Sequence, residues 1–221
     1  MSVSNPPTTR RLIGSSLIIG SLLTLLVATL PEEQTLGHIL KAVFLHAALV
    51  QTGLIFFAVA GALGLAYLLR PNAGLAHWNV AAQGAALWIW VAYALSSMAA
   101  TYMAWGIAIA WYEPRTRASA AVLGAALLFA LLARWLADAR FLALVNLLAA
   151  GLSWFLVKGA SLLRHPFDPI GTSDSALFQA FFAGIFLLTL IAAGQLLWFL
   201  YLRARHRPVR QANLPRQQHA A

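Results

Sequence analysis

Apolar residues form six long stretches separated by short polar segments. Their approximate ranges are 12–30, 43–69, 78–100, 118–137, 141–156 and 176–202. A transmembrane helix needs roughly 20 mostly apolar residues to cross a hydrocarbon core of about 30 Å. The pattern therefore predicts an all-α polytopic membrane protein with six transmembrane helices. Only residues 138–140 join the fourth and fifth stretches, which predicts a tight helical hairpin at that point.

Composition agrees with this class. The chain is 61% hydrophobic and 10% charged, with a mean hydropathy of +0.77, whereas soluble domains carry about 25% charged residues. The sequence contains no cysteine, which excludes disulfides, thiolate metal sites, iron–sulfur clusters and covalent haem attachment through cysteine. Few polar residues lie inside the stretches. We expect those few, such as Asn146 and Gln195, to form hydrogen bonds between helices.

The charges indicate an orientation. Fifteen Lys and Arg against six Asp and Glu give a formal charge of +9, and in six spans the positive-inside rule puts both termini in the cytoplasm. The cytoplasmic side would carry Arg10, Arg11, Arg70, Arg134, Arg140, Arg203, Arg205, Arg207, Arg210 and Arg216. The opposite side would carry only Lys41, Arg115, Arg117, Lys158 and Arg164. Because the basic residues flank apolar runs, they indicate topology rather than nucleic-acid binding.

The stretches form one domain. We expect a single six-helix membrane domain over residues 1–207, with an external tryptophan-rich loop at 101–117, and a basic, disordered cytoplasmic tail at 208–221. The first stretch ends in Leu-Pro-Glu-Glu rather than in a small-residue cleavage site. We therefore expect it to stay in the protein as an anchor.

Histidines on the predicted outer side are candidate ligands. His46 lies near the start of the second stretch, in Phe-Leu-His-Ala-Ala, and His165 precedes the sixth, in Arg-His-Pro-Phe-Asp-Pro. Each could form an ordinary hydrogen bond at the membrane interface. Together, at similar depth, they could also ligate one haem iron from opposite faces. His38, in the preceding loop, is the weaker candidate.

Aromatic residues concentrate between the third and fourth stretches. Trp105, Trp111 and Tyr112 are followed by Arg115 and Arg117. They could form an aromatic belt that anchors two helices. If the segment is helical, Trp105, Ile109 and Tyr112 instead share one face. Exposed rings beside guanidinium groups would suit a flat, apolar dianion such as a porphyrin.

These residues resemble a known signature. Trp105-Gly106, Trp111 and then Glu113-Pro114-Arg115-Thr116 are similar to the tryptophan-rich "WWD" motif of CcmC-type haem-handling proteins of cytochrome c maturation. The contexts of His46 and His165 are similar to those of the two external histidines in that family. The order of the elements along the chain also agrees. Ala108 and Ile109 stand where the family has its middle tryptophans, and Glu113 replaces Asp.

The resemblance implies a function. Haem b would be held at the outer face of a bacterial or archaeal cytoplasmic membrane, with His46 and His165 as axial ligands. The residues expected to contact the haem or pair with its propionates are Trp105, Trp111, Tyr112, Arg115, Arg117 and Arg164. The haem would pass to a chaperone of CcmE type, with ABC transporter subunits of CcmA and CcmB type driving release.

No enzymatic turnover is expected, because the sequence offers no nucleophile–base pair and no phosphate-binding loop. The alternative is a structural or quinone-interacting subunit of a respiratory complex without its own haem. A subunit with two embedded haems would typically need four histidines within its spans, and only His46 comes close.

Overall fold

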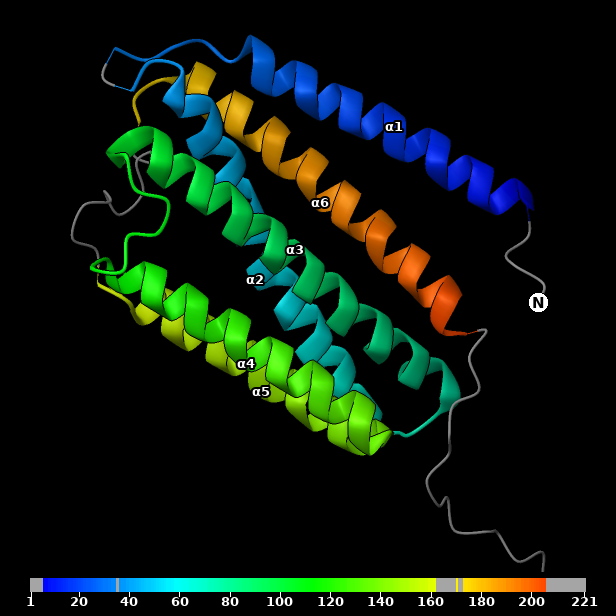
Figure 1. The fold of residues 1–221 in the computed structure, drawn as a ribbon. Helices are drawn as coiled ribbons and strands as arrows, with labels where there is room; N and C mark the ends of the chain where they lie inside the picture. The colour runs from blue at the N-terminus through cyan, green and yellow to red at the C-terminus, as the bar shows by residue number, and fades with distance from the viewer. Residues whose placement is uncertain (1–5, 35, 162–169, 171–172, 206–221) are drawn as a thin grey trace, which may run out of the picture.

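The computed structural model describes residues 6–34, 36–161, 170 and 173–205. It confirms the all-α class, since the described residues form six helices and no strand. The helices are α1 (Pro6–Thr29), α2 (Ile39–Leu69), α3 (Ala73–Trp105), α4 (Pro114–Leu136), α5 (Ala139–Gly159) and α6 (Ala176–Ala204). All six are long and apolar enough to cross a membrane, and they lie side by side (Figure 1). The protein is thus a multi-pass membrane protein.

Several helices are longer than the apolar stretches that predicted them. α3 has 33 residues and is therefore about 50 Å long, which exceeds a hydrocarbon core of about 30 Å. α2 begins at Ile39 rather than near residue 43. Hydropathy locates only the part of a helix that meets lipid, so α2 extends beyond its predicted start and α3 extends beyond both predicted limits.

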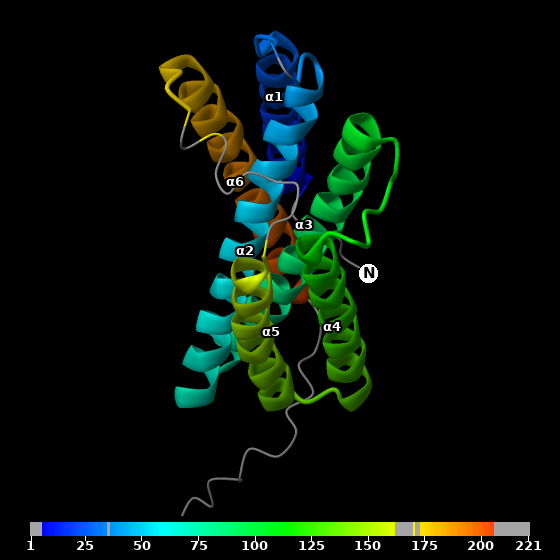
Figure 2. The same cartoon turned by 90° about the vertical axis from the view of Figure 1, so that its left-hand side faces the viewer.

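α2 lies at the centre of the bundle, where it packs against α3, α5 and α6. α4 packs on α5 at one edge, and α1 packs mainly on α6 at the other (Figures 1 and 2). Glycines allow the closest approach: a Cβ atom at Gly64 would lie 2.5 Å from the carbonyl oxygen of Ala143 in α5. Such small-residue contacts drive helix association in lipid.

Two of the polar side chains inside the spans, Asn146 and Gln195, bond between helices, as expected. The Asn146 side-chain amide donates to the Asn79 side-chain oxygen at 2.7 Å, and both residues are buried. Gln195 in α6 bonds to two serines of α1. Unsatisfied polar groups are costly in a bilayer, so these bonds help to fix which helix faces which.

The hairpin between α4 and α5 is also confirmed. Ala137 adopts a left-handed conformation with φ of 51°, and the Asp138 side chain caps α5 by accepting from the Phe141 amide at 2.7 Å. This turn lies at the end of the bundle where α1 begins and α6 ends, which we call the terminal end (Figure 1). The opposite end, which carries the α3–α4 connection, is called the loop end. The predicted tail at 208–221 lies outside the described residues.

The cytoplasmic location of the terminal end stays a prediction, which cysteine labelling can test in this cysteine-free chain. We expect Ser2→Cys to be protected from a membrane-impermeant maleimide in intact cells. Gln34→Cys, in the exposed α1–α2 turn at the loop end, should react. The positive-inside rule gives this outcome because the arginine-rich end stays in the cytoplasm. The reverse labelling pattern would overturn the orientation and move every site below to the other face.

Candidate functional site

His46 lies between α2 and α3 near the loop end. Its half-buried ring contacts the Tyr93 ring, with centroids 5.1 Å apart and planes inclined at 31°. His46 is seven residues from the start of α2, which places it about 10 Å along the helix. It therefore lies two turns inside α2, deeper in the helix than the sequence predicted.

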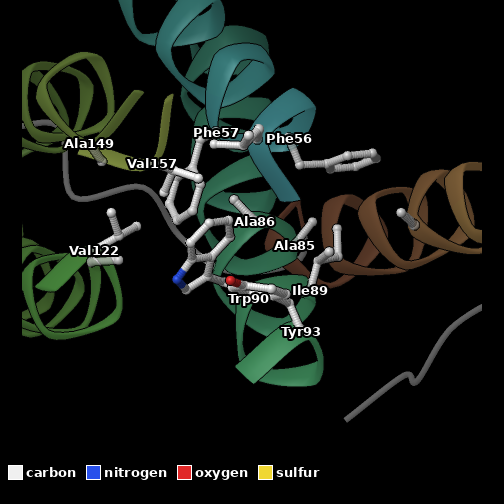
Figure 3. Close-up of a cluster of buried hydrophobic side chains, with 13 residues drawn as sticks. Phe56, Phe57, Ala85, Ala86, Ile89, Trp90, Tyr93, Val122, Ala149 and Val157 are labelled. Atoms are coloured by element: carbon white, nitrogen blue, oxygen red, sulfur yellow. The ribbon is translucent and has the colours of Figure 1, made fainter. Parts of the chain in front are cut away.

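Tyr93 and Trp90 connect this histidine to α4. The Tyr93 hydroxyl lies 2.8 Å from Ser119 Oγ, and the Trp90 indole N–H donates to the Ser119 carbonyl at 3.1 Å. Figure 3 shows the indole nitrogen of Trp90 directed toward the α4 side of the cluster. Buried Tyr and Trp need such partners for their polar atoms. His46, Trp90, Tyr93 and Ser119 thus form one layer across three helices, which we call the histidine layer.

A glycine makes room for this layer. A Cβ atom at Gly53 would lie 2.7 Å from the Trp90 ring, which is closer than real side chains approach. Gly53 lies two turns after His46 on α2, and two helical turns return to nearly the same face. Trp90 can therefore pack closely against α2, and the α2 face that carries His46 stays close to α3.

Charged residues at the start of α4 lie beside the histidine layer. Glu113, the residue that precedes α4, is only 1% exposed, and its position at a helix N-terminus suits a negative charge. Arg115 is half-buried and its Nε atom is buried, and it lies one helical turn before Ser119 on α4. Arg117 is exposed. The loop end therefore has one buried acid and two cations next to the aromatic rings.

The aromatic segment does not form the predicted helix. Trp105 is the last residue of α3, and Gly106 ends the helix in a left-handed conformation with φ of 72°. Residues 106–113 form an irregular connection, held by a 2.7 Å hydrogen bond from the Thr101 hydroxyl to the Ala108 carbonyl. The shared helical face of Trp105, Ile109 and Tyr112 is therefore wrong.

The connection nevertheless brings aromatic rings together. The rings of Trp105 and Tyr112 lie 6.4 Å apart. Trp111 is 57% exposed and Tyr112 is 40% exposed, and neighbouring apolar side chains are exposed too. The aromatic surface at the loop end consists of Tyr102, Trp105, Ile107, Ile109, Trp111 and Tyr112.

This aromatic surface and the histidine layer lie at different depths. Tyr93 and Trp105 are twelve residues apart on α3, or about 18 Å along the helix axis. Ser119, the α4 member of the layer, follows the start of its helix by only five residues. α3 thus projects beyond α4, and the connection returns along it (Figure 1). The structure brings His46 to Tyr93, and Trp105 to Tyr112.

Other predicted residues are placed differently. His165 and Arg164 lie outside the described residues. His38 is exposed at the start of α2 and makes no side-chain capping bond. Lys41 donates to the Ala28 carbonyl at 2.8 Å and so joins α2 to α1. Within the described ranges, no three His, Asp or Glu side chains group as a metal site would require.

Sequence reasoning missed three members of the histidine layer: Trp90, Tyr93 and Ser119. The signal was available in part, because Trp90 and Tyr93 are aromatic residues with polar atoms one turn apart inside an apolar span. Such atoms need hydrogen-bond partners in lipid. Their partner, Ser119, lies 26 residues from Tyr93 in the sequence, so spacing alone does not identify it.

Among the described residues, this site offers one imidazole rather than a cluster of three donors. Haem iron already has four porphyrin nitrogens and needs one or two axial ligands, which a single imidazole begins to supply. Comparison of the chain with protein-family models, curated proteins and solved structures finds no match. A function for this site therefore has to follow from its own residues.

Proposed function

We propose that this membrane protein handles haem at the loop end of its bundle, with His46 as an axial ligand of the iron. The observation that carries the proposal is the position of the His46 imidazole. Its half-buried ring contacts Tyr93, whose hydroxyl lies 2.8 Å from Ser119 Oγ near the start of α4, the helix that carries Arg115 and Arg117. A histidine imidazole holds the haem iron in globins and peroxidases.

The remaining residues divide between the porphyrin plane and its charges. Exposed rings of Trp111 and Tyr112 offer apolar faces on which a porphyrin stacks. Arg115 and Arg117, together with Arg164, would pair with the propionates through charge-assisted hydrogen bonds. His165 would supply the second axial ligand. The chain has no cysteine, so haem b is bound without a covalent bond, as suits a cargo that must be released.

The resemblance to CcmC-type proteins extends this proposal to partners. The recipient would be a haem chaperone of CcmE type, docking where Trp111 and Tyr112 are exposed. ABC transporter subunits of CcmA and CcmB type would supply the energy for release, because this chain has no phosphate-binding loop of its own. The bundle would then lie in the cytoplasmic membrane of a bacterium or archaeon, with the loop end outside.

The contribution of the aromatic surface can be tested separately from that of the axial ligand. We expect the double variant Trp105→Ala/Trp111→Ala to retain roughly tenfold less haem, since each aromatic contact contributes about 0.5–1.5 kcal/mol. The spectrum of the haem that remains should be unchanged, because the axial ligand is unaffected. Haem per protein is measured in purified samples by pyridine haemochrome assay and absorption spectroscopy.

The matched control is Trp88→Ala/Trp135→Ala, which removes two exposed tryptophans that lie elsewhere on α3 and α4. It should retain haem like the unmodified protein. Equal haem loss in both double variants, or a parallel loss of membrane insertion, would instead assign Trp105 and Trp111 to an anchoring belt.

A further inference from the structure

A groove lies between α1 and α6 on the outside of the bundle, toward the terminal end. Its volume is about 430 Å³. Its lining includes Leu12, Ser16, Gly20 and Leu23 of α1 and Gln195 and Phe199 of α6. The lining is almost entirely apolar, and it belongs to neither the histidine layer nor the aromatic surface.

The groove is closed toward the loop end and open toward the terminal end. A Cβ atom at Gly184 would lie 2.8 Å from the Leu26 side chain, so the two helices touch there. By contrast, a Cβ atom added at Gly20 or at Gly194 would meet only open space. From Leu12 to Leu23 the groove extends about 16 Å along α1, which is half of a hydrocarbon core of about 30 Å. Its length therefore matches one leaflet of a bilayer.

Polar atoms in the groove are already engaged. Ser16 Oγ donates to the Gln195 side-chain oxygen at 3.0 Å, and the Gln195 amide donates to Ser15 Oγ at 2.9 Å. Ser15 in turn donates to the Leu12 carbonyl at 3.1 Å. These bonds hold α1 against α6, and they leave an apolar surface for whatever fills the groove.

The mouth of the groove is positively charged. Arg10 and Arg11 directly precede Leu12 on α1, and both are exposed. On α6, the Arg203 guanidinium lies 5.3 Å from the ring of Phe199, which lines the groove. Neither α1 nor α6 contains an acidic residue. An anion at this mouth would meet three cations from two helices.

We propose that the groove holds one acyl chain of an anionic phospholipid, whose phosphate pairs with Arg10, Arg11 and Arg203. The length of one leaflet fits a lipid chain, whereas a transmembrane helix from a second copy needs the full thickness of the core. Arginine pairs strongly with phosphate oxygens. The bound lipid fills the space between α1 and α6 and so holds α1, which otherwise contacts little besides α6, in place.

The test measures lipid retained by the full-length protein. The detergent-purified protein is incubated with phosphatidylglycerol or with phosphatidylcholine of the same acyl chains, and bound lipid is counted by native mass spectrometry. We expect phosphatidylglycerol to be retained preferentially. Arg10→Gln/Arg11→Gln should weaken its binding about thirtyfold, because each arginine near an anionic surface contributes about a factor of five. Arg134→Gln/Arg140→Gln, at the same end of the bundle, is the matched control.

A second pair of variants tests the groove itself. Gly20→Leu fills open space in the groove and should displace the lipid, whereas Gly124→Leu fills open space on α4 and should not. Equal retention by these two variants would overturn the site, as would equal binding of the two lipids. Two further results would overturn the proposal by showing another occupant of the groove. One is a dimer that is lost only in Gly20→Leu, and the other is a quinone in the organic extract that is lost only in that variant.

Discussion

Replacing His46 with Ala is expected to strip the protein of haem or to leave it five-coordinate. Loss of an outer-shell partner already lowers metal affinity by about 10–100-fold, so loss of an axial ligand should lower haem content by at least that factor. His46 is the ligand candidate whose surroundings are described, and its ring is held against Tyr93. The measurement is the absorption spectrum, together with haem per protein, of samples purified in parallel.

His38→Ala is the matched control, because His38 lies eight residues before His46 on the same segment. His38 is exposed, and its side chain makes no capping hydrogen bond to α2. It should leave haem content and spectrum unchanged. Added imidazole should partly restore the six-coordinate spectrum of His46→Ala by filling the vacant position. His165→Ala should behave like His46→Ala. Haem loss in His38→Ala with full retention in His46→Ala would show that the ligand assignment is wrong.

Gly64→Ala is expected to destabilise the bundle more than its single methyl group suggests. The new Cβ atom would lie 2.5 Å from the Ala143 carbonyl oxygen. A backbone atom cannot rotate away as a side chain can, so α2 and α5 must separate. Overpacking of this kind costs about 1–3 kcal/mol. The separation would also strain the neighbouring Asn79–Asn146 hydrogen bond. The loss is measured as a lower midpoint of thermal unfolding in detergent.

Gly151→Ala on α5 is the control, because a Cβ atom there meets open space. Alanine is the better helix former by up to about 1 kcal/mol, so this variant should be as stable as the parent or slightly more stable. If Gly64→Ala proved as stable as Gly151→Ala, the close packing of α2 on α5 would be incorrect.

The six spans and the α4–α5 hairpin could be predicted from the sequence because lipid requires a long run of apolar residues in each helix. The ends of the helices could not. α3 continues to Trp105, five residues beyond its predicted limit. The part of a helix outside the hydrocarbon core does not have to be apolar, so hydropathy does not show where the helix ends. This extension separates the aromatic surface from His46 along the bundle axis.

The aromatic connection was half predictable. Gly106 followed by an apolar segment and then Pro114 is typical of a helix end and a new helix start, and the structure has both. The 6.4 Å approach of Trp105 to Tyr112 arises from the irregular backbone between them. The helical period of 3.6 residues does not apply to an irregular segment, so the predicted shared face of Trp105, Ile109 and Tyr112 is not formed.

The sequence by itself determined the class of protein, the number of spans, the clustering of arginines at span ends and the absence of cysteine chemistry. The tertiary structure decided which face of each helix meets which neighbour: His46 against Tyr93, Asn146 against Asn79, and Gln195 against α1. The physical reason is that lipid chains and neighbouring helices are equally apolar, so hydropathy does not distinguish them. Close packing and interhelical hydrogen bonds make that choice, and both depend on residues far apart in the chain.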